Sequence, residues 1–236
     1  MVNWKIRHKA QTASTNRDAF NGEPWNVYTC DWQTNGRGRL NHVWQSGKGT
    51  NLAMSAVLPI GALSIERVST LPVFVGYAVS LAVEGLAARK VWIKWPNDIL
   101  VDSKKLCGIL CERHGDNVIA GIGMNIRRME FSADIAAKAI CLEDIAGKGI
   151  CIESVRDGIL DIIATNWKSW RDEGLAPFIG GIRERDYLNG HHIEVESVDG
   201  DTFPIAGYCQ GISLNGTIKV AGREVYSGQA HIAAIR

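Results

Sequence analysis

The chain has 236 residues, of which 46% are hydrophobic, enough for one sizeable core and a small second domain, so it is not a miniature that depends on disulfides. Its 26 Lys and Arg residues are balanced by 25 Asp and Glu residues, so no basic excess favours nonspecific binding to nucleic acid. The N-terminus is charged where a signal peptide needs an apolar stretch, and no later run approaches the roughly 20 apolar residues that span a bilayer. We therefore expect a cytoplasmic protein without a membrane partner.

Six cysteines are scattered without paired spacing, and a cytoplasmic location keeps them reduced. We expect them to fill the core. Cys107 and Cys111 are four residues apart in an apolar run that is typical of a buried strand rather than of a zinc site. We therefore predict no bound metal as part of the protein.

Up to residue 186 the sequence alternates helical and strand patterns. Residues 65–89 carry Ala, Val and Leu at helical spacing, and Pro72 should divide them into a short and a longer helix. Residues 91–95 and 118–123 are typical of strands. From Ser154 to Trp170 apolar residues recur every 3.6 positions, and Ser154 is expected to cap this helix.

From Tyr187 onward the pattern changes to short strands separated by turns. Strands are expected at 192–196, 205–212 and 218–220, with turns at Asp199–Gly200 and Asn215–Gly216 and further strand material in 225–235. This texture predicts a small antiparallel barrel or sandwich appended to an α+β domain, with domains at 1–186 and 187–236.

The most unusual segment is Gly36-Arg37-Gly38-Arg39. Glycines let successive N–H groups turn toward an anion, and arginines suit phosphate or carboxylate oxygens. Taken alone, such a segment is more often a solvated turn. It matches neither the phosphate-binding P-loop nor the dinucleotide fingerprint, so a bound nucleotide would need another architecture.

Two other polar segments have both a structural and a functional interpretation. Lys94-Trp95-Pro96-Asn97-Asp98 follows an expected strand, so its amide and carboxylate should lie on a strand-end loop, although such residues also make ordinary turns. Lys105 could point into the same pocket or remain solvated. Ser14-Thr15-Asn16 is typical of a helix N-cap, yet its small polar groups could hold a neutral ligand. Glycines in Gly121-Ile122-Gly123 allow close approach to a strand.

Taken together and in this order, the motifs resemble those of the biotin protein ligases. They are Ser14-Thr15-Asn16, Gln33 with Gly36 to Arg39, Trp44, Lys94 to Asp98, Lys105 to Leu110 and Gly121 to Asn125. The resemblance implies a class II synthetase-like catalytic domain, with a mixed β-sheet and flanking helices, and a small SH3-like C-terminal β-barrel.

The same resemblance implies roles for individual residues. It places biotin against Ser14, Thr15, Asn16, Gln33, Arg37, Gly38, Arg39, Lys105 and Gly108, and the nucleotide against Arg39, Trp44, Asn97 and Lys105. Arg39 and Lys105 would stabilise phosphoryl charge, and Asp98 would help the acceptor lysine to lose its proton. The sequence departs from many members at Leu40-Asn41, where they have a further Arg and Gly.

The implied reaction uses ATP and Mg²⁺ to convert biotin into biotinyl-5′-AMP, and then transfers biotin to a lysine of a biotin carboxyl carrier protein of acetyl-CoA carboxylase or a related carboxylase. Only about ten residues precede Ser14, too few for the DNA-binding winged helix of some members, so we expect no DNA partner. A homodimer is possible. Two alternative functions also stay open: a lipoate ligase, whose ligand has no ureido ring, and a noncatalytic anion-binding regulatory module.

Overall fold

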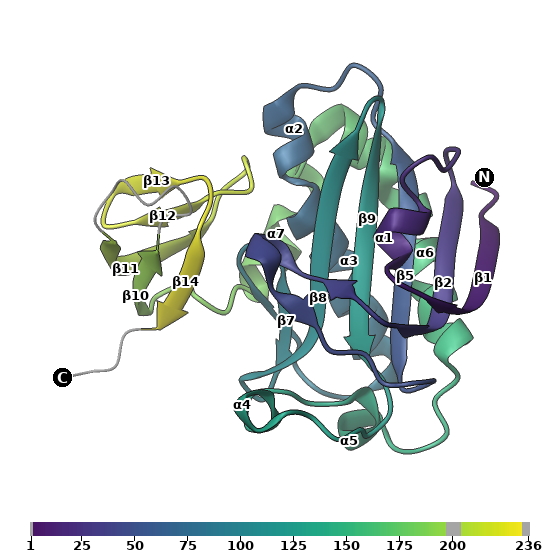
Figure 1. Ribbon diagram of the computed structural model, residues 1–236. Coiled ribbons are helices and arrows are strands. Elements are labelled where there is room, and N and C mark those ends of the chain that lie inside the picture. The colour runs from purple at the N-terminus through teal and green to yellow at the C-terminus, as the bar shows by residue number, and fades with distance from the viewer. Residues whose placement is uncertain (1, 197–203, 233–236) are drawn as a thin grey trace.

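The larger part of the protein is built on a seven-stranded mixed sheet (Figure 1). The computed structural model describes residues 2–196 and 204–232. From one edge to the other, the strands are β1 (Lys5–Thr12), β2 (Asn26–Gln33), β5 (Asn51–Pro59), β9 (Asn117–Asn125), β8 (Lys104–His114), β7 (Asp98–Val101) and β6 (Trp92–Lys94). Strands β1 and β2 are parallel, and every other neighbouring pair is antiparallel.

Helices cover one face of this sheet. The longest are α3 (Leu71–Leu86) and α6 (Ile152–Glu173), which pack against each other and against the strands, accompanied by α2 (Ile65–Ser69), η2 (Ala176–Phe178) and α7 (Ile179–Glu184). The predicted division of residues 65–89 is confirmed, because Pro72 lies in the first turn of α3, where a missing N–H costs nothing. Helix α6 begins at Ile152 with Cys151 as its N-cap, so the expectation that Ser154 caps it is wrong.

Aromatic rings fill the space between the helices and the sheet. The rings of Trp167 and Trp170 stack with centroids 4.9 Å apart, and Phe74 lies 5.7 Å from Trp170. Phe74 and Trp170 are both 1% exposed or less, so each removes a large apolar surface from water. Gly76 of α3 lies against Ile109 of β8, where the missing side chain lets helix and sheet approach.

Residues 65–86 form a helical stretch that is long and apolar enough to cross a membrane by length and composition alone. This differs from the expectation that no run approaches that length. In the structure 56% of its most apolar window is buried inside the protein, and the stretch belongs to the core. Its hydrophobicity is therefore explained by packing on the sheet.

The cysteines only partly follow the expectation that they fill the core. Cys30, Cys107, Cys141 and Cys209 are buried, but Cys151 is exposed, because it precedes the first turn of α6 at the surface. Burial raises the pKa of the Cys30 and Cys209 thiols to about 11, so both stay protonated at neutral pH.

The C-terminal part is a five-stranded antiparallel, barrel-like sheet. Its order is β13 (Arg223–Val225), β12 (Ile218–Val220), β11 (Ile205–Ile212), β10 (His192–Glu196) and β14 (Gln229–Ile232). The turn at Asn215–Gly216 is confirmed, whereas the turn expected at Asp199–Gly200 lies outside the described residues.

Two buried polar contacts attach this sheet to the larger part. Trp95 Nε1 donates to the Gly216 carbonyl at 2.8 Å. The Asp186 carboxylate accepts the N–H groups of Leu188, at 3.0 Å, and of Ile212, at 2.8 Å. The small sheet is thereby held in a defined position beside the open face of the large one.

Candidate active site

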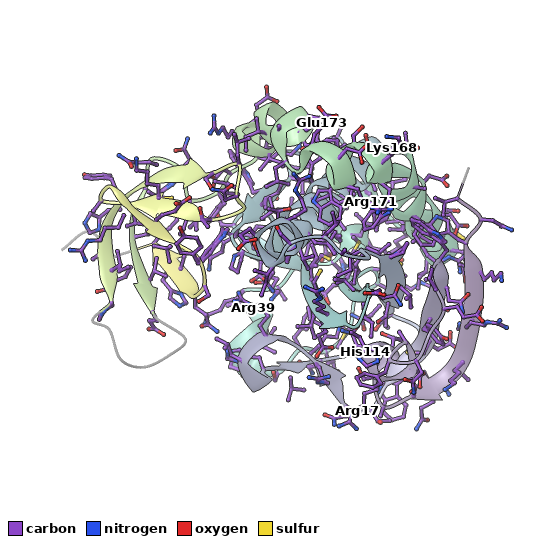
Figure 2. The ribbon with its side chains drawn as sticks, turned by 90° about the horizontal axis from the view of Figure 1, so that it is seen from above. Arg17, Arg39, His114, Lys168, Arg171 and Glu173 are labelled. Carbon is purple, nitrogen blue, oxygen red and sulfur yellow. The ribbon has the colours of Figure 1, made fainter. Side chains whose placement is uncertain are left out.

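A cavity of about 430 Å³ opens on the face of the large sheet that α3 and α6 leave free. Its walls come from β8 and β9, from α1 (Thr15–Asp18), from the hairpin of β3 (Gly36–Arg37) and β4 (Val43–Trp44), from α4 (Ala133–Ala136) and from β14 of the small sheet. In Figure 2, Lys168, Arg171 and Glu173 lie on the helical side of the molecule, and Arg39 lies away from it, next to the C-terminal sheet.

All site residues expected from the sequence line this one cavity. They are Ser14, Thr15, Asn16, Gln33, Arg37, Gly38, Arg39, Trp44, Asn97, Asp98, Lys105 and Gly108. Ser14 and Gly108, the first and the last of these residues, are 94 positions apart in the chain, and the antiparallel pairing of β7 and β8 places the later ones side by side.

Glycines at paired positions of β8 and β9 make the floor of the cavity flat. Gly108 and Gly123 are cross-strand partners, and the Trp44 indole lies on them. A Cβ atom at Gly123 would be 2.6 Å from Trp44 Cε2. Gly121 provides the same room for Asn16, whose Oδ1 would be 2.2 Å from a Cβ atom there. Gly121 and Gly123 were predicted to permit close approach to this strand, and in the structure the groups that approach are the side chains of Asn16 and Trp44.

Neutral polar side chains gather above Gly121. Ser55 is paired with Gly121 across β5 and β9, and its Oγ lies 2.7 Å from Thr15 Oγ1 and 2.6 Å from Asn16 Oδ1. Thr15 donates its backbone N–H to Gln33 Oε1 at 2.8 Å. Ser14 is the N-cap of α1, but its side chain makes no capping bond, so capping does not explain this hydroxyl.

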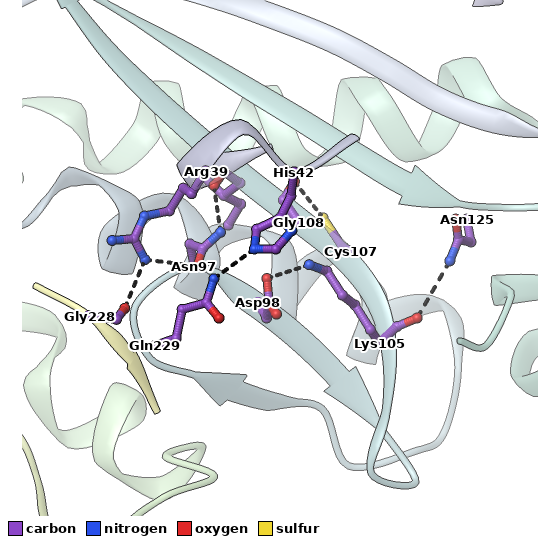
Figure 3. Close-up of polar contacts among 11 residues, drawn as sticks. Arg39, His42, Asn97, Asp98, Lys105, Cys107, Gly108, Asn125, Gly228 and Gln229 are labelled. Carbon is purple, nitrogen blue, oxygen red and sulfur yellow. Dashed lines mark hydrogen bonds and ion pairs between the residues drawn. The ribbon is translucent and has the colours of Figure 1, made fainter. Parts of the chain in front are cut away.

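Charged side chains gather near Gly108 of β8, which pairs with Gly123 two residues further along β9. Lys105 Nζ lies 2.7 Å from Asp98 Oδ1 (Figure 3), and Asp98 is the cross-strand partner of Gly108. Asp98 is the first residue of β7 rather than part of a loop. Ser55 and Asp98 are two residues apart along the sheet and three strand spacings apart across it, so their backbones are separated by roughly 16 Å, and the neutral and the charged group both line the same cavity.

Arg39 connects this charged group to the C-terminal sheet. Its Nη1 donates to Asn97 Oδ1 and to the Gly228 carbonyl, both at 3.4 Å (Figure 3). Burial lowers the pKa of the Arg39 guanidinium, and the nearby charge of Asp98 opposes that shift. An arginine remains protonated even so, and Arg39 therefore presents a positive charge to the cavity.

The hairpin that carries Arg39 closes despite the departure at Leu40-Asn41. Gly38 donates its N–H to the His42 carbonyl at 2.7 Å, and Leu40 takes a left-handed backbone conformation with φ 53°. Gly36 packs so tightly that a Cβ atom would lie 2.5 Å from the Trp44 carbonyl oxygen. The Gly-Arg segment, for which a solvated turn was the alternative interpretation, is thus a short paired hairpin.

Several residues of the cavity were not predicted as site residues. Lys94 is the cross-strand partner of Asp98, and burial lowers the pKa of its ammonium group, a shift that Asp98 opposes. His42 contacts Gln229 of β14, with His42 Nε2 and Gln229 Nε2 2.9 Å apart. No local pattern marks Gln229, because it reaches the cavity from a different sheet. Ser55 stands in an apolar strand, where a single buried hydroxyl is the signal that could have found it.

Comparison with known proteins agrees with this geometry. The sequence model of the biotin/lipoate A/B protein ligase family matches residues 8–127. The chain belongs to this family. The resemblance inferred from the ordered motifs is therefore confirmed, and so is the expected fold class.

Individual family members are similar over different lengths. The bifunctional ligase/repressor BirA of Bacillus subtilis is 31% identical over 158 residues, which cover 64% of this chain and 48% of that protein. The biotin–[acetyl-CoA-carboxylase] ligase of Mycobacterium tuberculosis is 26% identical, covering 96% of this chain and 88% of that one. The chain thus spans about half the length of the curated relatives that match it first.

Solved structures show the same fold. A biotin protein ligase from Aquifex aeolicus, in complex with biotin and ATP, is 26% identical and superimposes with a TM-score of 0.84, covering 96% of this chain and 97% of that chain. A biotin protein ligase from Leishmania major, in complex with biotinyl-5-AMP, is also 26% identical, with a TM-score of 0.68.

Proposed function

We propose that this protein activates biotin with ATP and transfers it to a lysine of a biotin carboxyl carrier protein. The observation that carries the proposal is the lining of the cavity, which has a neutral polar group (Thr15, Asn16 and Gln33, backed by Ser55) at one end and a charged group (Arg39, Asp98 and Lys105) at the other. A ligand with a polar uncharged ring at one end and a carboxylate at the other fits both groups.

In the first half-reaction, a biotin carboxylate oxygen attacks the α-phosphorus of ATP, and the bond to the bridging oxygen breaks to release pyrophosphate. Negative charge grows on the phosphoryl oxygens as this happens. Arg39 and Lys105 are cations that line the cavity here, and charges that a protein holds near the reacting group are a major source of rate enhancement. The Trp44 indole offers a flat surface to the nucleotide.

In the second half-reaction, the amine of the carrier lysine attacks the acyl carbon of the adenylate, and AMP leaves. A lysine amine is mostly protonated at neutral pH and has to lose its proton first. Lys105 forms an ion pair with Asp98, with Nζ 2.7 Å from Oδ1. If Lys105 turns to the phosphoryl oxygens, the Asp98 carboxylate becomes available to accept that proton.

Magnesium would enter this site with the triphosphate. Mg²⁺ binds oxygen ligands and usually shares one or two carboxylates with substrate phosphates. Asp98 and Asp134 supply carboxylates to the cavity wall, so they are the groups that fit such an ion. Within residues 2–196 and 204–232 no cluster of three or more His, Cys, Asp or Glu side chains could hold a metal by itself.

One assay distinguishes this function from its alternatives. The purified protein is incubated with ATP and either biotin or lipoate, and pyrophosphate release is measured. We expect pyrophosphate to be released in the presence of biotin and not in the presence of lipoate. Release with lipoate alone would indicate a lipoate ligase, and no release with either would favour a noncatalytic binding module.

The remaining expectations concern partners and location. Transfer of biotin to a purified carrier domain, detected by mass on a single lysine, tests the proposed acceptor. The cytoplasmic location, the lack of DNA and membrane partners and the homodimer stay predictions from the sequence.

A further inference from the structure

Three positively charged side chains surround the Asp98 carboxylate at the charged end of the cavity. They are Lys94 of β6, Lys105 of β8 and Arg39 of the hairpin, and all of them line the cavity together with Asp98. The proposed reaction uses Arg39 and Lys105, which face the phosphoryl oxygens. It leaves the third cation, Lys94, without a role.

The hairpin of β6 and β7 holds Lys94 next to Asp98. The two residues are cross-strand partners, and in an antiparallel pair the Cβ atoms of such partners are about 4.5–5.5 Å apart on one face of the sheet. Lys105 comes from β8, the strand on the other side of β7, and its Nζ lies 2.7 Å from Asp98 Oδ1 (Figure 3). Within the described part of the chain Lys94 forms no ion pair. Asp98 therefore has one cation in contact and a second within reach of a side-chain rotation.

The Asp98 carboxylate depends on these charges. Its Oδ1 is buried and receives no hydrogen bond of suitable direction from the groups that the structure describes, so the close contact with Lys105 Nζ acts mainly through charge. A carboxylate oxygen that is removed from water is destabilised when it loses its counter-ion. Burial lowers the pKa of the Lys94 ammonium group, and the Asp98 charge opposes that shift and so favours the charged form of Lys94.

We propose that Lys94 is a positioning residue for the second half-reaction, because it becomes the counter-ion of Asp98 when Lys105 turns to the phosphoryl group of the adenylate. The charges then match, with Arg39 and Lys105 at the phosphoryl oxygens and Lys94 at the carboxylate. In that step Asp98 takes a proton from the ammonium group of the acceptor lysine, the freed amine attacks the acyl carbon, and AMP leaves. Without Lys94, a single lysine has to serve the carboxylate and the phosphoryl group in turn. The inference rests on the proposed function.

The direct test is Lys94→Met, which removes the ammonium group and keeps a long unbranched side chain. Biotinyl-5′-AMP is bound to the enzyme in advance, and transfer to a purified carrier domain is followed in a single turnover. A positioned base contributes about 10²–10⁴ to a rate, so we expect this transfer to slow roughly ten- to a hundredfold. Biotin-dependent pyrophosphate release does not need Asp98 as a base and should stay near the wild-type rate. Lys94→Arg keeps the positive charge and should restore most of the transfer rate.

Two comparisons separate this role from a structural one. In the Asp98→Asn background, Lys94→Met should cause no further loss, because Lys94 acts through the Asp98 carboxylate. Hydroxylamine is an unprotonated nucleophile at neutral pH, so its reaction with the bound adenylate needs no base and should keep its wild-type rate in Lys94→Met. Lys219→Met is the matched control. Lys219 is exposed and is the cross-strand partner of Glu224 in the small sheet, so its loss should leave both half-reactions unchanged.

Thermal unfolding is measured on all variants beside the two rates. Wild-type transfer in Lys94→Met or in Asp98→Asn would overturn the inference. So would an equal loss from Lys94→Met in the Asp98→Asn background, a slowed reaction with hydroxylamine, or a Lys94→Arg protein as slow as Lys94→Met. In each case biotin-dependent pyrophosphate release by the wild type leaves the proposed function intact, and its absence overturns both. If Lys94→Met does not fold, Lys94→Gln, which is also uncharged, takes its place in every comparison.

Discussion

The fit of Trp44 on the glycine floor can be tested with a single methyl group. In Gly123→Ala the new Cβ atom would lie 2.6 Å from Trp44 Cε2 and 3.0 Å from its Cδ2 and Cζ2. Carbon atoms in contact are about 3.5–4.0 Å apart, so the indole has to move by about 1 Å. Overpacking of this kind costs about 1–3 kcal/mol, which lowers the melting temperature of a protein of this size by roughly 2–12 °C.

The displaced indole should also weaken nucleotide binding. Stacking of a base on an aromatic ring is worth about 1–3 kcal/mol, and losing about 1–2 kcal/mol raises KM for ATP roughly 5- to 30-fold. Calorimetric or fluorescence-monitored melting and initial rates at varied ATP measure both effects.

Two further glycines serve as controls. A Cβ atom at Gly158 of α6 would have no atom of another segment within 4 Å, so Gly158→Ala should leave KM unchanged and stabilise the protein by up to about 1 kcal/mol. In Gly108→Ala the nearest atoms are 3.3 Å away, and one belongs to the flexible Lys105 side chain, so the loss of stability should be smaller than for Gly123→Ala. A Gly123→Ala protein with wild-type melting temperature and KM for ATP would refute the reasoning.

Three other substitutions test single groups. Arg39→Gly should weaken retention of the adenylate, so that released biotinyl-5′-AMP labels bystander amines; unchanged release would count against the role of Arg39. Asp98→Asn should slow transfer from preformed adenylate to the carrier, and a wild-type transfer rate would remove Asp98 as the base. Burial raises the pKa of the Asp186 carboxyl group in the folded protein, so the stability that its protonated form contributes is lost as pH rises through that pKa. In Asp186→Asn the melting temperature should therefore depend less on pH above about pH 4 than in the wild type. An unchanged pH profile of the melting temperature would contradict this.

The sequence predicted those parts of the fold whose side chains follow a regular apolar period. Helices α3 and α6 and strand β9 bury one face or both, and their patterns identify them. Strand β1 was not predicted, because nearly all of its side chains are exposed and only its parallel pairing with β2 makes it a strand.

The sequence predicted those site residues that belong to short local motifs. Ordered motifs such as Gly36 to Arg39 could be assigned by resemblance, but the bond between Asn16 and Glu112 joins residues 96 positions apart and leaves no local signal. Ser55 and Glu112 become informative only when β5, β9 and β8 are placed side by side, since it is the missing Cβ of Gly121 that lets Asn16 lie between them.

The C-terminal sheet contacts Arg39, the hairpin residue that is proposed to bind phosphate. Arg39 donates to the Gly228 carbonyl of the segment before β14 and to Asn97 of the large sheet, and both bonds are long at 3.4 Å. Long hydrogen bonds are weak, so exchanging them for charge-assisted bonds to a phosphoryl group is favourable. His42, three residues further along the hairpin, contacts Gln229. We therefore expect a ligand that draws Arg39 inward to change how the hairpin is held against the small sheet.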